Sequence, residues 1–557
     1  MSKLLALQLC GSVRDVAFLI GFQPKALGYV AWGTNARYST FDIPKRSGGK
    51  RTIHAPIPQL KLAQRKIADL LQDCELEIET SLGVKRRLSH GFRKDHSILT
   101  NADIHHGQRY VLNLDLEDFF GTVNFGRVRG YFLTNKHFRL QPDVATLLAQ
   151  IACHESKLPQ GAPTSPVISN LVGNILDMRL VKLARANGCA YSRYADDISF
   201  STSTPEFPTE VAIETSPNVW TVSKTVDDAV GACGFKVNPS KTRLLHRRSR
   251  QDVTGIVVNK FVNVNADYRR RTRVMVHHLC STGSFHRASV VLSATGDTSV
   301  QKEVGSRPQL QGMIGFIQQA ESFRRGSAPL PTALSAIEKL NRRFLFYTRF
   351  AAPEMPMLVF EGKTDAVYLN AAIKNLAASY PTLANSSGLL VQLLRQTKTI
   401  ERLFGLSGGA DPLLKFIKHY HDEYRHIQGP KGSFPVIAVF DNDSVAKGVI
   451  NSITGIKKAA VPPGTQVVRV YDNLYVMLTT PLGGPSHCIE DCFDPTFITA
   501  ALGGKTINFT SKPNRSNEVS KSYFAEQIVK PKWKTIDFDG FRPLLDEIVK
   551  IASAHTP

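Results

Sequence analysis

The sequence predicts two folded parts of different class, an α+β part over residues 36–352 and an α/β part that begins at residue 353. Residues 191–201 alternate between apolar and polar types on both sides of a short break, which is typical of a β-hairpin. From residue 261 to about residue 350 the apolar spacing is helical, interrupted by a loop at 324–331. After Pro353 and Pro356 strands and helices alternate, as they do around a parallel sheet.

The composition indicates a folded protein that binds polyanions. The chain has 557 residues, of which 42% are hydrophobic, enough for more than one core. Its 69 Lys and Arg against 47 Asp and Glu give a net charge of +22, so nucleic acid is the leading partner and a membrane surface the alternative. No run approaches the roughly 20 apolar residues of a bilayer span, and residues 4–10 are too short for a secretory signal. We expect a cytoplasmic protein with no membrane anchor.

The chain opens with an apolar segment and a basic hairpin. Residues 1–35 have helical spacing and predict a small N-terminal helical segment. Residues 38–56 predict two short strands joined by a glycine-containing turn. Lys45, Lys50 and Arg51 at this turn can approach phosphates, although a solvated cationic hairpin is the alternative interpretation.

Three aspartates are the candidate catalytic and metal-binding residues. Asp196 and Asp197 lie at the tip of the hairpin, and an apolar strand over residues 110–115 ends in Asp115. Adjacent carboxylates repel each other and gain nothing from packing, which indicates a site for divalent cations. An Asp-Asp pair by itself also occurs in many ordinary surface turns, and only the surrounding motifs set that alternative aside. Asp115 and Asp196 would hold two Mg²⁺ ions around an attacking hydroxyl and a nucleoside triphosphate.

The order of the surrounding motifs resembles the palm of reverse transcriptases. Tyr-Ala-Asp-Asp at 194–197 follows Leu-Pro-Gln-Gly at 158–161, and Gly-Phe-Lys-Val-Asn-Pro-Ser-Lys comes after them at 234–241. The resemblance implies a right-hand polymerase, with fingers and palm over residues 36–260 and a helical thumb over 261–352. It places Lys45 and Arg51 of the fingers near an incoming triphosphate.

The same resemblance gives roles to residues of the nucleotide site. It puts the ring of Phe120 under the sugar, where a 2′-hydroxyl would clash. It places Gln160 and Gly161 against the nucleotide, in a loop where a side-chain amide and a bare backbone are available. Lys241 resembles a palm lysine near the triphosphate, and an ordinary surface lysine is the alternative.

Two further elements resemble those that set retron reverse transcriptases apart. The first is Asn-Ala-x-x-His, with Asn101 and His105, and the second is Val253, Thr254 and Gly255. The resemblance implies that these residues bind RNA. On physical grounds alone, a histidine such as His105 is more often a hydrogen-bonded structural residue than a catalyst, and we keep that interpretation as the alternative.

An arginine-rich stretch opens the predicted thumb. Seven arginines lie within residues 247–273, and we expect them to bind structured RNA and the template-primer duplex through phosphates. A solvated charged face is the alternative. The candidate RNA-binding arginines are Arg269, Arg270, Arg271 and Arg273.

In the C-terminal part, acids follow two predicted strands. Glu361 comes after an apolar run at 357–360, and Asp441 and Asp443 come after another at 434–440. Ligands bind at the carboxyl ends of strands in open α/β sheets. This arrangement resembles the Toprim domain of topoisomerases, primases and a family of nucleases, which implies that the three acids hold one or two Mg²⁺ ions. A helix cap at Glu361 and an Asx turn at 441–443 are the alternative.

Glu490 is a candidate additional ligand, because some nucleases that this part resembles have an extra acid after the core. The Toprim-like domain is expected over residues 353–500. A basic C-terminal extension is expected over 501–557.

Together the resemblances imply a retron reverse transcriptase with a fused Toprim effector. Such an enzyme uses dNTPs to copy a partner noncoding RNA into branched RNA-DNA (msDNA), and the effector implies a nuclease-like role in antiphage defence. A homo-oligomer is compatible with the sequence. The alternatives are a group II intron-like reverse transcriptase of a mobile element and a non-catalytic RNA-binding scaffold; the intact Asp115, Asp196 and Asp197 argue against the latter.

Overall fold

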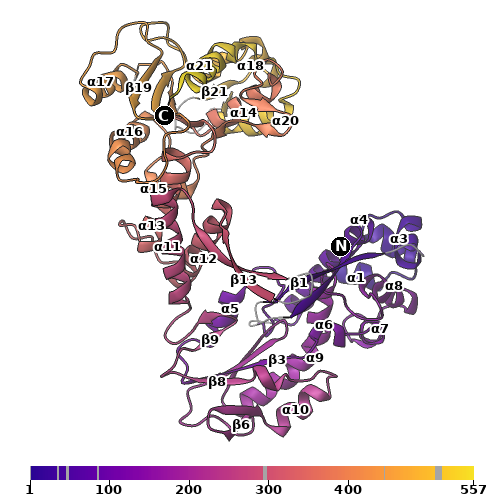
Figure 1. The fold of residues 1–557 in the computed structure, drawn as a ribbon. Coiled ribbons are helices and arrows are strands. Elements are labelled where there is room, and N and C mark those ends of the chain that lie inside the picture. The colour runs from indigo at the N-terminus through magenta and orange to yellow at the C-terminus, as the bar shows by residue number, and fades with distance from the viewer. Residues whose placement is uncertain are drawn as a thin grey trace. The chain divides into compact units, whose positions relative to one another are not determined.

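The chain divides into two compact units, which we describe separately. A computed structural model describes residues 2–33, 37–45, 49–83, 87–292, 298–444, 446–508 and 517–556 (Figure 1). The first unit comprises residues 1–269, 288–303 and 319–328, and the second comprises 270–287, 304–318 and 329–557. No helix among the described residues is long and apolar enough to cross a membrane.

The first unit is built around a four-stranded antiparallel sheet. Its central strand β3 pairs with β5 from Tyr110↔Thr202 to Asp115↔Asp197, and β8 pairs with the other edge of β3. The hairpin predicted at 191–201 is present, because β4 ends at Tyr194 and β5 begins at Asp197. In sheet order the strands are β4 (Ala190–Tyr194), β5 (Asp197–Thr202), β3 (Tyr110–Asp115) and β8 (Arg243–His246).

Helices cover this sheet and share one hydrophobic core with it. That core extends from Leu7 and Val16 near the N-terminus to Phe200 in β5, so the N-terminal helices pack on the same body. Helix α9 is apolar on several sides and buries 13 of its 22 residues, because it runs through the core rather than along its surface. The helices are α1 (Lys3–Gln8), α2 (Val13–Leu19), α3 (Pro24–Trp32), α4 (Pro58–Ser81), α5 (Ile98–Asp103), α6 (Phe119–Thr122), α7 (Phe125–Thr134), α8 (Pro142–Ala152), α9 (Ser165–Ala186), α10 (Lys224–Gly231) and the 3-10 turn η1 (Pro239–Lys241).

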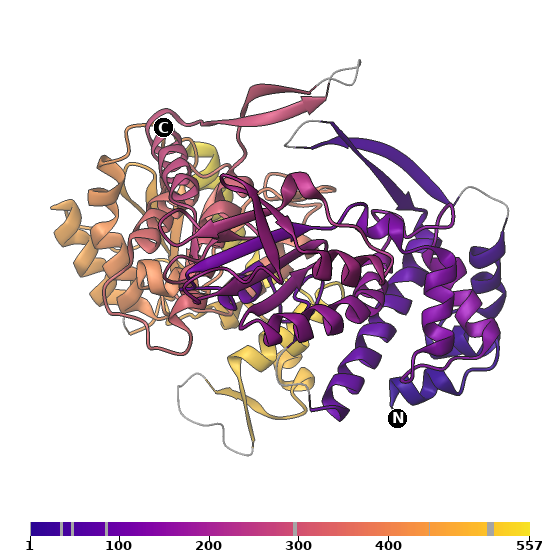
Figure 2. The ribbon, with the colours of Figure 1, turned by 90° about the horizontal axis from the view of Figure 1, so that it is seen from below.

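Short strands complete the first unit. The predicted basic hairpin is formed by β1 and β2, paired from Tyr38↔Pro56 to Pro44↔Lys50, and its strands are drawn as a pair of long arrows in Figure 2. The remaining strands are β6 (Ala212–Ser216), β7 (Val219–Val222), β9 (Asp252–Val253), β10 (Ile256–Val257) and β11 (Asn263–Val264), added to β1 (Tyr38–Pro44) and β2 (Lys50–Pro56).

A second hairpin interrupts the region that we expected to be helical up to residue 350. Strands β12 (His286–Leu292) and β13 (Thr298–Val304) form a two-stranded sheet between α11 and α12. Valine and threonine are frequent in this stretch, and their branching at Cβ favours strands over helices. The expectation that residues 286–292 and 298–304 are helical was therefore wrong.

The second unit contains a five-stranded sheet in the order β17-β14-β18-β20-β19. The pairs β17·β14, β14·β18 and β18·β20 are parallel, and β19 runs antiparallel at the edge. Every residue of β14, β18 and β20 is buried, as expected for strands with helices on both faces. The strands are β14 (Met357–Phe360), β17 (Gln392–Leu393), β18 (Val436–Phe440), β19 (Val467–Tyr471) and β20 (Leu474–Leu478), with the small pairs β15 (Ala384–Asn385), β16 (Gly388–Leu389) and β21 (Thr506–Asn508), β22 (Glu518–Ser520).

Helices precede, cover and follow this sheet. Those that precede it are α11 (Ala266–Thr282), α12 (Arg307–Arg325), α13 (Ala336–Phe346) and the π-helix η2 (Tyr347–Ala351). Those within and after it are α14 (Asp365–Asn375), α15 (Lys398–Phe404), α16 (Ala410–Arg425), α17 (Ala446–Lys457), η3 (Ile489–Cys492), α18 (Pro495–Ala501), α19 (Lys521–Tyr523), η4 (Phe524–Val529), α20 (Lys530–Lys532), η5 (Asp539–Phe541) and α21 (Arg542–Ala554).

Much of the predicted thumb packs with the C-terminal sheet. Tyr347 donates its hydroxyl hydrogen to the carbonyl of Pro430 over 3.0 Å, and Tyr420 donates to that of Phe350 over 2.9 Å. The ring centroid of Phe350 lies 4.8 Å from that of Phe416. These buried aromatics cross the position of Pro353, so the prolines mark a change of pattern but no break in the packing.

Candidate active site and a second acidic cluster

The three aspartates predicted to be catalytic lie together in the first unit. Asp115 and Asp197 are register partners at the end of the β3·β5 ladder. The carbonyl of Asp196 accepts a hydrogen bond from the amide of Leu116 over 3.1 Å, which ties the hairpin tip to the end of β3. The sheet register thus fixes which acids meet.

The hairpin tip is tightly enclosed. Ala195 is buried and has a φ of 56°, the left-handed conformation that a two-residue hairpin turn requires. A Cβ at Gly91 would lie 2.7 Å from the amide nitrogen of Ala195, so glycine is required at that position. The turn that carries the adjacent aspartates is therefore held from outside the hairpin.

The aspartates are held close together against their mutual repulsion. Burial, followed by the charges of Asp196 and Asp115, raises the pKa of Asp197 to about 6. Burial also raises the pKa of Asp196. The ammonium of Lys241 lies 2.9 and 2.8 Å from the two carboxylate oxygens of Asp115, and this hydrogen bond raises the lysine's pKa. A cation therefore already neutralises part of the charge.

The donor set suits Mg²⁺, which prefers carboxylate oxygens. Among the described residues, no three His, Cys, Asp or Glu side chains are arranged closely enough to hold one ion. The side chains of Asp115, Asp196 and Asp197 would have to converge on a metal, with Lys241 turning away from Asp115. Binding of a divalent cation would be favourable here, because the ion would remove the repulsion among the buried carboxylates.

A cavity of about 860 Å³ opens above these acids and contains the predicted nucleotide residues. Its size is that of ordinary small-molecule sites. The basic hairpin supplies one side of it, and the Leu-Pro-Gln-Gly loop another. The predicted residues that line it are Lys45, Lys50, Arg51, Phe120, Gln160 and Lys241.

The loop with Gln160 and Gly161 is joined to the fingers strand β2. The carbonyl of Gln160 accepts a hydrogen bond from the amide of His54 over 2.9 Å. Gly161 has a φ of 120°, and a Cβ there would lie 2.8 Å from the carbonyl oxygen of His54. Gly161 is thus needed for the close approach of two backbones and does not line the cavity itself.

The structure corrects the prediction that Asn101 and His105 contact RNA. His105 is fully buried, with its ring nitrogens 2.7 Å from the hydroxyls of Ser201 and Ser192. Ser192 in turn donates to the amide oxygen of Asn101 over 2.7 Å. Both residues therefore brace α5 against the strands of the aspartate hairpin, since a buried side chain has no surface to offer a nucleic acid.

The second retron-like element lies beside the first. Val253 in β9 is fully buried, which corrects the prediction that its side chain meets RNA. Thr254 and Gly255 form the turn between β9 and β10, with φ values of 48° and 80°, and they reach the surface. The amide of Gly107, just beyond the first element, donates to the carbonyl of Val258 over 2.9 Å.

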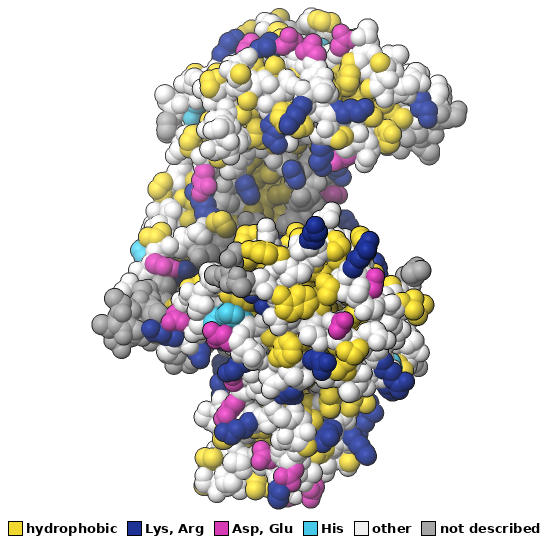
Figure 3. All heavy atoms as spheres, turned by 90° about the vertical axis from the view of Figure 1, so that its right-hand side faces the viewer, with side chains coloured by type: hydrophobic (Ala, Val, Ile, Leu, Met, Phe, Trp, Pro, Cys, Tyr) yellow, Lys and Arg dark blue, Asp and Glu magenta, His cyan; other side chains and the backbone are white. Residues whose placement is uncertain are grey.

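The arginines at the start of α11 differ in their surroundings. Arg269 is half-buried and lies 3.2 Å from the carboxylate of Glu321, and it also donates to Asn263 over 2.8 Å. Arg270, Arg271 and Arg273 are exposed. On the face drawn in Figure 3, Lys and Arg side chains are scattered rather than gathered in one patch. Arg269 therefore has a structural partner.

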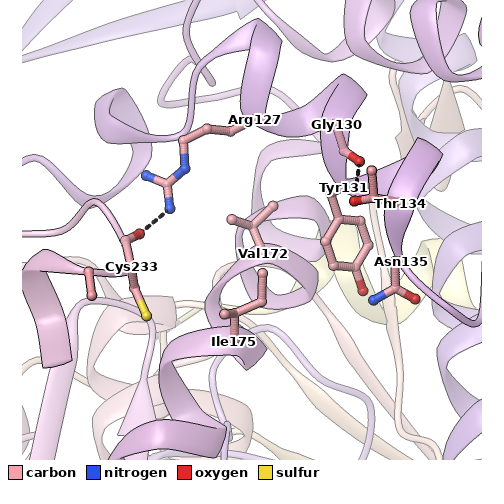
Figure 4. A pocket seen from close by; sticks show the side chains of 9 residues that line it. Arg127, Gly130, Tyr131, Thr134, Asn135, Val172, Ile175 and Cys233 are labelled. Atoms are coloured by element: carbon pink, nitrogen blue, oxygen red, sulfur yellow. Dashed lines mark hydrogen bonds between the residues drawn. The ribbon is translucent and has the colours of Figure 1, made fainter.

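A smaller cavity in the first unit contains none of the acids. It measures about 290 Å³ and lies between α7 and α9 (Figure 4). Arg127 points across it and donates to the carbonyls of Cys233, Thr122 and Gly234 over 2.7–3.2 Å. This guanidinium therefore fastens the segment after α10 to α7 and is not available to a ligand.

The second unit holds its own acidic cluster at the carboxyl ends of β14 and β18. Glu361 follows β14, and its amide donates to the carbonyl of Val439 in β18 over 3.3 Å. Asp441 follows β18 and accepts from the amide of Ile489 over 3.0 Å, which places Glu490 next to it. Burial, followed by the charge of Asp443, raises the pKa of Glu361. The predicted acids therefore do come together.

Two members of this cluster were missed by sequence reasoning. Asp365 accepts a hydrogen bond from the amide of Gly362 over 2.7 Å, and burial, followed by the charge of Glu490, raises its pKa to about 6. Its position four residues after Glu361 was the available signal. The ammonium of Lys521 lies 3.1 Å from both carboxylate oxygens of the buried Glu490. No local pattern indicates that lysine, which lies 31 residues further along the chain.

The charges of this cluster are incompletely balanced. Burial and the neighbouring Asp365, Glu361 and Glu490 raise the pKa of Asp441 to about 8. Burial lowers the pKa of Lys521, but the negative charges of Glu490 and the other acids raise it. The net effect is a raised pKa. Four carboxyl groups thus share one ammonium, and here too no three of the described acids are arranged closely enough to hold one ion.

Comparisons with known proteins agree with the geometry of the first unit. Residues 43–258 match the family model described as reverse transcriptase (RNA-dependent DNA polymerase). The Retron Mx162 reverse transcriptase of Myxococcus xanthus is 36% identical over 332 residues, which cover 56% of this chain and 64% of the relative. The Retron Mx65 reverse transcriptase of the same species is 38% identical, covering 43% and 55%, and the Retron Ec86 reverse transcriptase of Escherichia coli is 29% identical, covering 49% and 80%.

The sheet, the three aspartates and these matches define the first unit as a reverse transcriptase fold. Within that class, the curated relatives to which the chain is similar are retron reverse transcriptases. The chain spans 64% and 55% of the lengths of the two Myxococcus relatives.

Proposed function

We propose that this chain is a retron-type RNA-directed DNA polymerase. The observation that carries the proposal is the pairing of Asp115 with Asp197 beside Asp196, at the base of a cavity lined by the basic fingers hairpin. Mg²⁺ held by the three aspartates would lower the pKa of the primer hydroxyl and neutralise charge on the phosphoryl oxygens.

The chain's own residues would position the reactants. The primer hydroxyl oxygen attacks the α-phosphorus of a dNTP, forming one P–O bond as the bond to pyrophosphate breaks. Lys45, Lys50 and Arg51 line the cavity where the triphosphate charge would lie. Phe120 lines the same cavity and would exclude a 2′-hydroxyl.

The template is a structured noncoding RNA, and the enzyme acts on it in the cytoplasm. Similarity to retron reverse transcriptases supports this proposal, since retron enzymes use their own RNA and begin the cDNA at a guanosine 2′-hydroxyl. The product would be branched RNA-DNA (msDNA). The net charge of +22 agrees with an RNA partner.

The test measures DNA synthesis by the double variant Asp196→Asn, Asp197→Asn in the presence of its RNA. Loss of Mg²⁺-dependent DNA synthesis with nearly unchanged RNA binding is expected, because the exposed arginines are untouched. Asp227 and Asp228 form a second adjacent pair on α10, outside the cavity, and their replacement by Asn is the matched control. Undiminished extension by the first variant would refute the assignment.

A second activity is supported by the acidic cluster of the second unit. We propose that this α/β part is a Toprim-like, Mg²⁺-dependent nuclease effector acting in antiphage defence. Glu361, Asp441 and Asp443 would hold one or two ions, with Asp365 and Glu490 as further ligands. Raised pKa values at Glu361, Asp365 and Asp441 support a site that gains from a bound cation.

The test separates the two activities by expressing variants with the RNA and scoring branched DNA and phage plaques. Glu361→Ala or Asp441→Ala should eliminate protection while DNA synthesis survives, because each site belongs to a compact unit with its own core. Asp411→Ala, at an exposed acid on α16, is the control. Full protection by the Glu361 and Asp441 variants would assign these acids a structural role.

A further inference from the structure

A cavity in the second unit lies between helices α12 and α13 and the segment that follows β17. It measures about 400 Å³. Gly315 opens one wall, because nothing lies within 4 Å of the place where its Cβ would be. The floor is apolar and includes Leu345, Met357 and Leu394, all of them buried. It contains none of the acids discussed above.

The polar groups of this cavity are cationic or neutral. Arg349 and Arg395 both line it, and among the described lining residues there is no Asp or Glu. Arg349 is half-buried and donates to the amide oxygen of Gln392 over 3.0 Å. Arg395 is exposed and makes no ion pair with another described residue. Two guanidinium groups without a carboxylate form a site for a phosphate.

Two amide side chains face the same space. Asn341 donates to the amide oxygen of Gln318 over 3.1 Å, and both residues line the cavity. This bond leaves the amide nitrogen of Gln318 and the amide oxygen of Asn341 without another hydrogen-bond partner among the described residues. A donor beside an acceptor matches the edge of a nucleobase, and the apolar floor suits its faces.

We propose that this cavity binds a nucleotide, with the phosphate at Arg349 and Arg395 and the base edge at Gln318 and Asn341. The volume lies within the range of ordinary small-molecule sites. The nucleotide is either free or part of a strand, since the recognised groups are the same in both. The site is separate from both acidic sites and does not depend on either proposed activity.

The nucleotide site is mechanically connected to the acidic cluster of the same unit. Gln396, next to Arg395, donates to the carbonyls of Phe360 and Glu361 over 2.8 and 3.3 Å. The carbonyl of Glu361 also accepts from the amide of Gly409 over 2.9 Å. A phosphate that holds Arg395 in place therefore also restrains the backbone of Glu361, so binding should reduce opening of residues 359–364.

The test is photolabelling of the full-length protein with 8-azido-AMP in EDTA, which suppresses metal-dependent binding elsewhere. Label is expected in peptides containing residues 311–318 or 393–400. Arg395→Glu should raise the concentration for half-maximal labelling about 10-fold or more, because a charge-assisted bond is replaced by repulsion. Lys398→Glu changes an exposed cation that does not line the cavity and should stay within about two-fold.

Competition experiments distinguish a free nucleotide from a nucleic-acid strand. Stronger competition by octadeoxyadenylate than by AMP would identify a strand, and stronger competition by AMP would identify a free nucleotide; either supports the site. Circular dichroism checks the fold, and Arg395→Gln replaces the charge reversal if the latter does not fold. Label on other peptides, or unchanged labelling of the folded Arg395 variant, would overturn the proposal. Unchanged hydrogen exchange at 359–364 with bound AMP would overturn the connection to Glu361.

Discussion

Arg193 and Asp177 form a bidentate ion pair inside the first unit, with two nitrogens of the guanidinium each 2.7 Å from a carboxylate oxygen. The side chains are 0% and 2% exposed. Arg193 also donates to the carbonyl of Ala195 over 3.0 Å, and Ala195 directly precedes Asp196. Tyr191 donates to the same carboxylate as the arginine. The pair thus holds the turn that carries the candidate catalytic acids.

Asp177→Asn is expected to lower the free energy of unfolding by about 3–5 kcal/mol, because it leaves a buried guanidinium without its counter-charge. Urea unfolding of the purified protein measures this. Asp228→Asn removes an exposed ion pair with Lys224 and should leave the free energy of unfolding nearly unchanged. An Asp177 variant as stable as the parent would show that the pair is not needed for the fold.

His105→Ala is expected to destabilise the protein by about 2–4 kcal/mol, because it opens a cavity and removes the hydrogen bonds of the ring to the hydroxyls of Ser192 and Ser201. RNA affinity of the folded fraction should stay within about two-fold. The neighbouring His106 is exposed, and its replacement by Ala is the control for both measurements. A loss of RNA affinity at unchanged stability would restore His105 to the RNA-binding residues.

Phe120→Ala is expected to weaken the discrimination against ribonucleotides. Phe120 lines the nucleotide cavity, and its ring centroid lies 6.1 Å from that of Phe92 and 5.6 Å from that of Phe119. Removing the ring should raise the ratio of kcat/KM for ribonucleotides over deoxynucleotides by about 10-fold or more. Phe132→Leu, at a fully buried ring of α7 that does not line the cavity, should leave the ratio unchanged. An equal ratio in both variants would exclude Phe120 from sugar selection.

The exposed arginines of α11 should determine the salt dependence of RNA binding. Replacing Arg270, Arg271 and Arg273 by Ala is expected to reduce the slope of log K against log salt by about 0.7–0.9 for each phosphate that is no longer neutralised. Arg269→Ala should leave the slope unchanged and lower stability instead, because Arg269 pairs with Glu321. Filter binding at several salt concentrations measures the slope, and an unchanged slope in the triple variant would make these arginines a solvated face.

The sequence alone located the acids that lie together in the two units, with the exception of Asp365, because local rules place them. Alternation of side chains set the hairpin with Asp196 and Asp197 at its tip, and apolar runs placed Asp115, Glu361 and Asp441 at strand ends. Period-2 patterns and turn residues act over a few neighbours, so they can be read without knowing the rest of the chain. The reverse transcriptase assignment followed from the order of such local motifs.

Only the tertiary structure decided what surrounds these residues. Three features depend on contacts between separate segments that no local pattern indicates. They are the burial of His105, the pairing of Arg193 with Asp177, and the contact of Lys521 with Glu490. The same holds for the aromatic packing across Pro353, where Phe350 meets Phe416. Burial and charge balance depend on which segments meet in space, and that is settled by packing of the whole core, because no short stretch determines its own partners.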